Sequence, residues 1–375
     1  MKLALFYHSL LSDWNHGNAH FLRGIAWELK ARGHEVRIFE PLDGWSLTHL
    51  LRDHGPAPID EFQRIYPGLC SEFYDPARLN LQAALKDIDL VIVHEWTAPE
   101  VVRRIAEHRA ANGGYRLLFH DTHHRSYSDP GAITQSHLKS FDGVLAYGRS
   151  IREIYLSHGW TEQVWVWHEA ADSRIFRPLD REKEGDLVWI GNWGDDERTA
   201  ELEEFLIAPV KSLALKAAVY GVRYPRYALA ALQAANIEYR GWLPNFRVPE
   251  VFARFRVTVH IPRRAYAKDL PGIPTIRPFE AMACAIPLIC SPWEDSERLF
   301  SPGSFMTARD GNDMQHVLRK LLNDPASAHT LAANGLKTAL AGHTCAHRVD
   351  QLLAIYRELT RGSTPGARVA AGARA

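Results

Sequence analysis

The stretch that decides the fold, residues 278–290, reads Pro-Phe-Glu-Ala-Met-Ala-Cys-Ala-Ile-Pro-Leu-Ile-Cys. Pro278 suits the first turn of a helix, where a missing N–H costs nothing, so a short helix is expected to begin there. Pro287 ends that helix and opens the apolar run Leu288–Cys290. Upstream, the apolar run Val257–Ile261 leads into a basic loop. This order of strand, loop, helix and strand is typical of an α/β unit.

Apolar runs typical of strands alternate with helical patterns along the whole chain. In the first half the expected strands are Leu3–Tyr7, Val36–Phe39, Ile88–Val93, Arg116–Phe119, Gly143–Tyr147 and Val164–Trp167. In the second half they are Leu187–Ile190, Ala217–Tyr220, Ile237–Tyr239, Val257–Ile261, Leu288–Cys290 and Phe305–Thr307. Several runs are continuously apolar, which suits strands buried on both faces. The pattern predicts right-handed βαβ units and parallel sheets.

A charged, proline-bearing break divides the chain in two. We expect a first domain over residues 1–168, a linker over 169–184, a second domain over 185–342 and a helix over 343–360. The tail 361–375, rich in Gly, Ala, Pro, Ser and Arg, is expected to be disordered. Ligands of open α/β sheets bind beyond the carboxyl ends of the strands. The crevice between the two domains is therefore the expected site.

Composition excludes several classes of protein. The 44 basic and 44 acidic side chains cancel, which gives no reason to expect nucleic acid or an anionic membrane as partner. No run approaches the ~18 apolar residues of a membrane span, and the first apolar run is too short for a signal peptide. The four cysteines, Cys70, Cys284, Cys290 and Cys345, form no C-x-x-C pair. We therefore expect no disulfide framework and no zinc site, and a location in the reducing cytoplasm.

Two groups of polar residues follow expected strands of the first domain. The loop Ser12–His20 holds Gly17, Asn18 and His20 and precedes a helix whose N-terminus favours an anion or hydroxyl-rich group. An ordinary helix-capping loop is the alternative. The second group, His120-Asp-Thr-His-His-Arg125, could transfer a proton near neutral pH. A metal site and a polar surface loop are the alternatives there.

Two more groups lie in the second domain. A glycine turn holding Gly191 and Asn192 precedes Arg198 and could present backbone N–H groups to a phosphate, although it also suits an ordinary helix start. The basic loop and the following helix supply Arg263, Arg264, Lys268, Arg277 and Glu280. Arginines and a helix N-terminus can hold a diphosphate, and a carboxylate can accept from the vicinal hydroxyls of a ribose. The alternative is that Glu280 complements the helix dipole.

Residues 278–289 resemble the F-E-A-M-A-C-G-x-P-L-I signature of GT-B glycosyltransferases of group 1. The subgroup that the chain is most similar to is the CgeB-like, spore-maturation type, on the strength of Ser12–His20, Ile190–Arg198, Ala170–Pro178 and His343–Arg348. The resemblance implies an α/β GT-B fold: two Rossmann-like domains whose parallel sheets face each other across a cleft. It also implies a closing helix that crosses back to the first, acceptor-side domain.

The resemblance implies roles for individual residues. Glu280 would contact the ribose, Trp242 and Leu243 would lie near the base, and the basic residues Arg198, Arg263, Arg264, Lys268 and Arg277 would neutralise the diphosphate. His120 and Asp121 would be catalytic. Gly272 departs from the family, because retaining members keep a glutamate eight positions before Glu280. Asp269 is the candidate to replace that glutamate.

We therefore expect a metal-independent, retaining glycosyltransferase. It would move a sugar from a nucleotide-diphosphate sugar, its co-substrate, to an acceptor that the sequence does not specify. No cofactor, nucleic acid or membrane partner is expected. Two alternatives remain open: a GT-B-fold epimerase acting on a nucleotide sugar, and a catalytically silent nucleotide-sugar-binding partner of another transferase.

Overall fold

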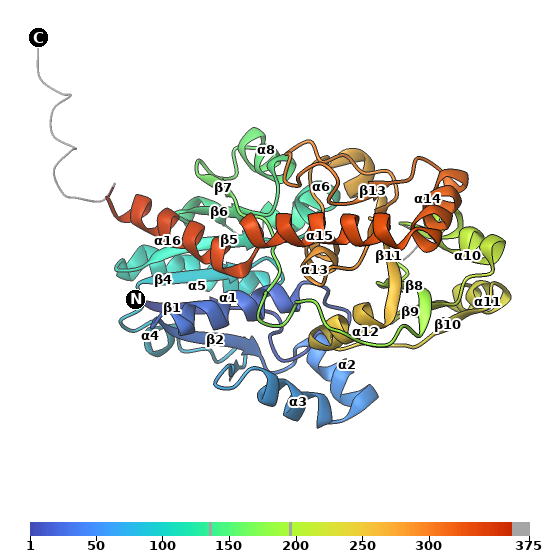
Figure 1. Cartoon of the computed structure of the whole chain (residues 1–375). Helices are drawn as coiled ribbons and strands as arrows, with labels where there is room; N and C mark the ends of the chain where they lie inside the picture. Colours follow the sequence, from blue (N-terminus) through green and yellow to red (C-terminus); the bar gives the residue numbers. More distant parts are fainter. Residues whose placement is uncertain (135–136, 195–196, 362–375) are drawn as a thin grey trace, which may run out of the picture.

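A computed structural model of the chain describes residues 1–134, 137–194 and 197–361. Within these residues the first sheet has seven strands in the order β3-β2-β1-β4-β5-β6-β7, and every pairing is parallel. The strands are β1 (Lys2–Phe6), β2 (Glu35–Pro41), β3 (Glu72–Tyr74), β4 (Leu90–His94), β5 (Arg116–Asp121), β6 (Gly143–Ala146) and β7 (Val164–Val166). Figure 1 shows this domain on the left, in blue to green.

The second sheet has six parallel strands among the described residues, in the order β10-β9-β8-β11-β12-β13. They are β8 (Gly185–Ile190), β9 (Ala217–Tyr220), β10 (Ile237–Tyr239), β11 (Phe255–His260), β12 (Leu288–Cys290) and β13 (Met306–Thr307). The two parallel sheets confirm the predicted fold class. Both strand orders reverse direction next to the first strand of the domain, which is where doubly wound sheets place their ligands.

Helices cover the faces of both sheets (Figure 1). Those of the first half are α1 (Ala19–Ala31), α2 (Trp45–His54), α3 (Ala57–Ile65), α4 (Leu81–Ala84), α5 (Pro99–Asn112), α6 (Arg125–Ser128), α7 (Pro130–Thr134), the 3-10 turn η1 (Leu138–Ser140) and α8 (Arg149–Ser157). Those of the second half are α9 (Thr199–Leu202), the π turn η2 (Glu203–Ile207), α10 (Ala208–Leu213), α11 (Arg226–Ala234), η3 (Asn245–Arg247), α12 (Val248–Arg254), the π turn η4 (Ala265–Asp269), α13 (Ile276–Ala283), α14 (Gly311–Asn323), α15 (Pro325–Gly342) and α16 (Cys345–Arg361).

The last helix returns to the first domain, as predicted. In Figure 1, α15 and α16, both in red, run across the molecule, and α16 lies against α1. Arg348 in α16 is buried and donates hydrogen bonds to the backbone carbonyl oxygens of His168, at 2.7 Å, and Glu169, at 3.3 Å. A parallel bridge joins Ala171 to Thr344. The segment between the sheets is therefore held by the start of α16.

Some elements differ from the sequence-based expectation. The helices α2, α3 and α4 and the short edge strand β3 lie in a region where no strand or helix was predicted. After Arg198, where a helix start was one of the two interpretations, the structure has the short helix α9 followed by a π turn. Ala285, which replaces the family's glycine, has a φ of 52°, so the strained turn before β12 is kept without glycine. The predicted tail beyond Arg361 lies outside the described residues.

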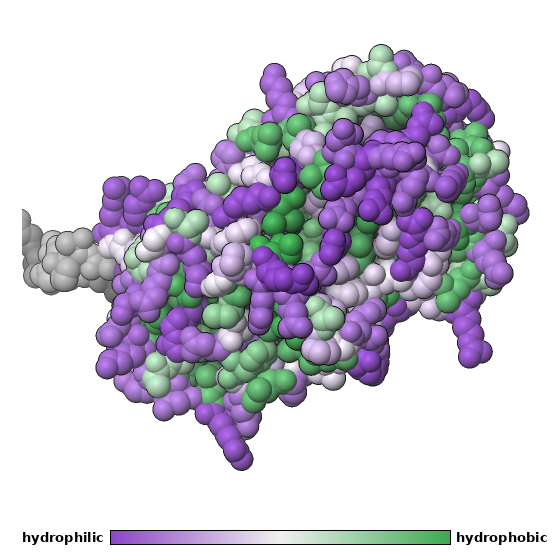
Figure 2. Space-filling view, turned by 60° about the horizontal axis from the view of Figure 1, so that its bottom comes forward, coloured by the Kyte–Doolittle hydropathy of each residue, from purple (hydrophilic) through white to green (hydrophobic). Residues whose placement is uncertain are grey.

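The described helices include none with both the length and the apolarity that crossing a membrane requires. Figure 2 shows one face of the molecule, on which hydrophilic side chains surround smaller hydrophobic areas.

The contact of α1 with the linker leaves no room for a side chain at Gly24. A Cβ atom there would lie 2.5 Å from Cys345 Sγ and 2.9 Å from Asp172 Cβ. Gly24→Ala should therefore lower the free energy of unfolding by about 1–3 kcal/mol, although alanine favours a helix. Gly342→Ala, at the end of α15, is the matched control because a Cβ atom there meets no atom within 4 Å. Denaturant unfolding of both variants is the test; equal stabilities would contradict the packing described.

Candidate functional site

The loop between β1 and α1 crosses the boundary between the domains. Asp13 is buried, and its carboxylate accepts hydrogen bonds from Trp242 Nε1, at 3.1 Å, and from the Asn245 backbone N–H, at 2.9 Å. Asn15 Oδ1 accepts a hydrogen bond from Asn192 Nδ2 at 2.6 Å. Trp242 and Asn192 belong to the second domain, so this loop brings two predicted donor-binding residues against the first domain.

Glu280 lies inside this boundary and not on an open surface. Its Oε1 is 2.6 Å from His20 Nδ1, and neither side chain has any exposed area. Arg277, one turn earlier in α13, donates to the other carboxylate oxygen. A Cβ atom on Gly17 would lie 3.9 Å from Ile276 Cγ2, at the first turn of α13. The structure thus brings the predicted loop and the predicted carboxylate together. A ribose can reach Glu280 only if His20 gives up this contact.

Two residues near the start of α13, Thr275 and His260, were not among the predicted site residues. Thr275 precedes α13 with a φ of 55°, a conformation that is rare for a β-branched residue and is often found at functional sites. His260 Nε2 lies 3.4 Å from Thr275 Oγ1, and its Nδ1 is buried with no hydrogen-bond partner among the described residues. Burial and the charges of Arg198 and Arg277 lower the pKa of His260 to about 3. Its place at a strand's carboxyl end was the signal that could have identified it.

Arg198 is the most confined cation of the site. Its guanidinium donates to the backbone carbonyl oxygens of Asn192 and, at 3.0 Å, Ile261. Burial, followed by repulsion from Arg263 and Arg277, lowers the pKa of Arg198 to about 10. Arg263 and Arg277 therefore each lie close enough to repel Arg198. An anion bound among them would relieve that repulsion.

The other predicted bases are more exposed. Arg263 forms an ion pair with Glu197 at 2.6 Å, and Arg264 forms one with Glu201 at 3.0 Å. The side chain of Arg264 is 43% exposed, and Lys268 is exposed as well. Arg263 thus stays with the group around Arg198, whereas Arg264 and Lys268 face solvent.

The remaining donor-side candidates line the domain boundary. The Gly191 carbonyl oxygen accepts from the Tyr224 hydroxyl at 2.7 Å, and Asn192 Oδ1 accepts from the Val222 N–H at 2.8 Å. Trp242 packs against a small apolar group made of Trp14, Leu50 and Val222, and Leu243 packs against the main core. These contacts fix the two loops that follow β8 and β10.

His120 and Asp121 end β5, and both side chains are fully buried. The ring of His120 packs against Trp167, with centroids 4.8 Å apart. Asp121 accepts hydrogen bonds from the Tyr155 hydroxyl, at 2.8 Å, and from the His123 N–H, at 3.0 Å. Burial lowers the pKa of His120 to about 3 and raises that of Asp121 to about 6. Trp167 thus covers His120, and Tyr155 of α8 contacts Asp121; the catalytic role of both residues stays a prediction.

Gly272 has no room for the family's glutamate. Its φ is +89°, and a Cβ atom would lie 2.7 Å from Glu297 Cγ. Glu297 is nearly buried, and its carboxylate accepts the Arg149 N–H at 2.6 Å and lies 3.2 Å from His168 Nε2. It therefore joins the second domain to the first in the space beside Gly272. Asp269, the candidate to replace the missing acid, is exposed.

A further acid, Glu169, lies in the linker beside the site and was not predicted. It is 4% exposed. Burial, together with the charge of Glu280, raises the pKa of Glu169 to about 8. A hydrogen bond from Asn18 acts in the opposite direction but is outweighed. At neutral pH its carboxyl group is therefore mostly protonated, which avoids placing a second negative charge next to Glu280.

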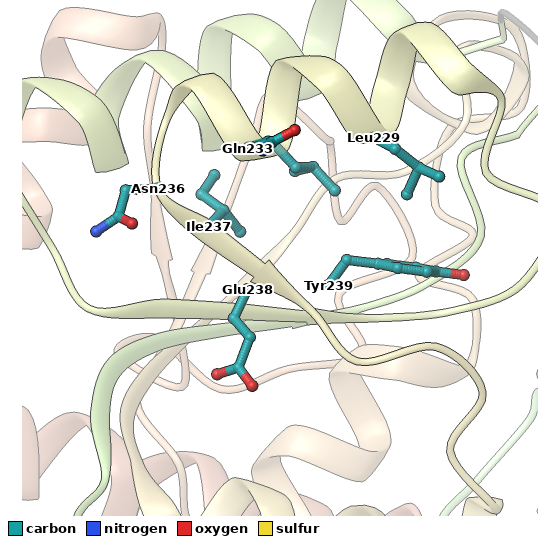
Figure 3. Close-up of a pocket in the computed structure, with 7 residues that line it drawn as sticks. Leu229, Gln233, Asn236, Ile237, Glu238 and Tyr239 are labelled. Atoms are coloured by element: carbon teal, nitrogen blue, oxygen red, sulfur yellow. The ribbon is translucent and has the colours of Figure 1, made fainter.

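Surface pockets lie away from this boundary. Figure 3 shows a pocket beside α11 and β10, whose volume is ≈ 470 Å³. Glu238 and Tyr239 are among its lining residues, and none of these residues is basic. Another pocket, of ≈ 340 Å³, borders the edge strand β3. The second pocket has Arg37, Arg78 and the N-cap residue Asn80 in its lining, but the helix that begins there, α4, has only four residues. The residues described hold no group of three or more His, Cys, Asp or Glu side chains placed to bind a metal ion.

Two family models match consecutive parts of the chain. The model described as Glycosyltransferase Family 4 matches residues 17–174, and the model described as Glycosyl transferase-like matches residues 174–354. The two matches meet in the segment between the sheets. No curated protein sequence gives a significant match.

Solved structures share the fold over nearly the whole chain. A sucrose-phosphate synthase from Thermosynechococcus elongatus is 16% identical with a TM-score of 0.66, covering 97% of this chain and 100% of that one. A glycosyltransferase from Rickettsia africae is 12% identical with a TM-score of 0.68, covering 96% and 99%. HepE from Anabaena, solved with UDP and glucose, is 13% identical with a TM-score of 0.68, covering 97% and 100%. At such identities the likeness establishes the fold alone.

The raised pKa of Glu169 makes stability depend on pH. The folded chain keeps this proton up to about pH 8, whereas the unfolded chain loses it near 4.5, so the free energy of unfolding should fall as pH rises between these values. Glu169→Gln cannot ionise and still accepts from Asn18. Its melting temperature should exceed that of the wild type by more at about pH 8 than at about pH 5.

Glu182→Gln, which removes an exposed acid of the same linker, is the control and should shift the melting temperature little at either pH. The same gain for Glu169→Gln at both pH values would show that this carboxyl group is ionised in the folded chain.

Proposed function

We propose that the chain transfers a sugar from a nucleotide-diphosphate sugar to an acceptor, because glycosyltransferase family models match residues 17–174 and 174–354. The donor would bind between the domains, with its diphosphate at the start of α13. UDP and UDP-glucose are bound in structures of HepE, which has the same fold, so uridine is the first base to test. A retaining outcome and a CgeB-like subtype stay predictions from the resemblance.

One observation supports this placement above the others. Arg198 is buried with Arg263 and Arg277 nearby, and burial, together with repulsion from these two arginines, lowers its pKa. The backbone N–H groups of the first helical turn point the same way as the positive end of the helix dipole. A diphosphate fits both the arginines and the helix N-terminus, because it supplies negative charge and several acceptor oxygens.

The same groups would assist the reaction. As the bond between the sugar and the diphosphate breaks, negative charge grows on the leaving phosphate oxygen. Fixed guanidinium groups and helix N–H groups stabilise that charge more than they stabilise the bound donor, which lowers the barrier. We propose that this charge comes from the chain itself and that no metal ion is required.

Loss of one of these arginines should weaken nucleotide binding. A hydrogen bond to a charged group contributes about 1.5–3 kcal/mol, so Arg277→Met and Arg198→Met should each raise the Kd of a nucleoside diphosphate about tenfold or more. Arg264→Met, which removes an exposed arginine of the loop after β11, is the control and should leave Kd nearly unchanged. UDP, GDP and ADP would be compared by calorimetry on variants whose melting temperatures show that they fold. No binding of any of the three by the wild type would contradict the proposed function.

Chelation should leave turnover intact. With a panel of nucleotide sugars and water or simple sugars as acceptors, release of the nucleoside diphosphate should be the same before and after treatment with EDTA. Loss of activity that one divalent metal restores would show that the arginines do not suffice.

A further inference from the structure

Three histidines meet at the carboxyl ends of two neighbouring strands of the first domain. His8 follows β1, His16 lies in the next loop, and His94 ends β4, which pairs with β1. The ring centroids of His8 and His16 are 4.0 Å apart, and those of His8 and His94 are 5.1 Å apart. None of the three was needed for the diphosphate site.

Two of these rings have unused nitrogens. His94 is satisfied, because its Nδ1 accepts the Trp96 N–H at 3.3 Å and its Nε2 lies 3.1 Å from Thr122 Oγ1. His8 Nδ1 and His16 Nε2 are buried and have no hydrogen-bond partner among the described residues. His16 is only 6% exposed. Since buried polar atoms in folded proteins nearly always have a partner, these two nitrogens indicate a place for a polar ligand.

Both rings are neutral in this setting. Burial lowers the pKa of His8 to about 3, and burial, together with His8 and Arg23, lowers the pKa of His16 well below its usual range. A neutral imidazole offers one N–H donor and one lone pair. A hydroxyl group can accept a hydrogen bond from the N–H and donate one to the lone pair, whereas a carboxylate can only accept. The pair therefore suits an uncharged, hydroxyl-bearing ligand.

The loop places His16 next to the diphosphate site. Its neighbour Asn15 is hydrogen-bonded to Asn192 in the loop that holds Arg198. Its other neighbour, Gly17, approaches the first turn of α13 at Ile276. A sugar attached to a diphosphate at the start of α13 would consequently meet the first domain at His16.

We propose that His8 and His16 form the subsite for the transferable sugar of the donor and select an uncharged hexose over a uronic acid. The proposal rests on the proposed function, because the sugar reaches these rings only from a diphosphate at α13. Trp96 is 44% exposed, and its ring centroid lies 6.2 Å from that of His8. It provides an aromatic surface at the edge of the subsite, against which a sugar ring can pack.

The test compares three uridine ligands on one protein. Calorimetry with UDP measures the nucleotide site alone. UDP-glucose and UDP-glucuronate differ at a single carbon of the sugar, so the ratio of their Kd values measures selection by the sugar subsite. The wild type should prefer UDP-glucose about tenfold or more, because neutral imidazoles supply no positive charge to compensate a buried carboxylate and one nitrogen of each ring presents a lone pair to it. If GDP or ADP binds in place of UDP, the matching hexose and uronic acid esters of that nucleotide are used.

Variants separate the ring nitrogens from the shape of the loop. His16→Gln places an amide near the position of Nε2, whereas His16→Asn ends short of it. The Gln variant should keep most of the preference for the hexose, and the Asn variant should lose it, both with the UDP affinity of the wild type within about twofold. His8→Asn should keep the preference in the same way, since its amide lies near Nδ1, and His8→Leu should lose it. His329→Asn, which changes an exposed histidine of α15, is the control.

The outcomes are distinct. No nucleoside diphosphate binding by the wild type would overturn the proposed function and this subsite together. Normal UDP binding with the same sugar preference in the wild type and in His16→Asn would overturn the subsite alone. Unchanged donor affinities with loss of turnover in His16→Asn would place the acceptor at these rings and also overturn the proposal.

Discussion

Two buried carboxylates, Asp13 and Glu280, hold the domains together, and the candidate site depends on both. Asp13 is paired with Arg23 at 2.8 Å in its own domain and accepts from two groups of the other domain. Glu280 is paired with Arg277 in its own helix and with His20 across the boundary. Removing one partner of such a pair leaves a buried charge uncompensated, which typically costs about 3–5 kcal/mol. The relative position of the sheets is thus set by charge as well as by apolar packing.

Much of this site could be predicted because this fold places functional residues at known positions. Parallel strands bring their carboxyl ends to one edge, so residues just after strands are the natural candidates. That rule identified the loop Ser12–His20 and the turn that holds Asn192, and the hydrogen bond between Asn15 and Asn192 joins these two segments. The continuously apolar strands and the proline at the start of α13 predicted the sheets and that helix with little error.

Other features depend on contacts between segments far apart in the sequence. The burial of His120 comes from Trp167, and the place of a glutamate at Gly272 is taken by Glu297. No local pattern reveals that His20 meets Glu280. The helices α2 and α3 were not predicted; they have only 10 and 9 residues and bury few side chains, and such short helices depend on tertiary packing for their stability.

The pair His20–Glu280 also limits how the site can open. If the ribose of the proposed donor bound Glu280, it would take the place of His20 and leave the imidazole in need of a new partner, so binding would exchange one contact for another. The helix α1, which begins at Ala19, is tied at its far end to α16, where Arg32 donates to Asp350 at 2.5 Å and to the Ala346 carbonyl oxygen at 3.0 Å. Rotation of α1 as a whole would break those bonds. The exchange would therefore fall to the His20 side chain and to the backbone at Gly17, which is exposed and has the conformational freedom of glycine.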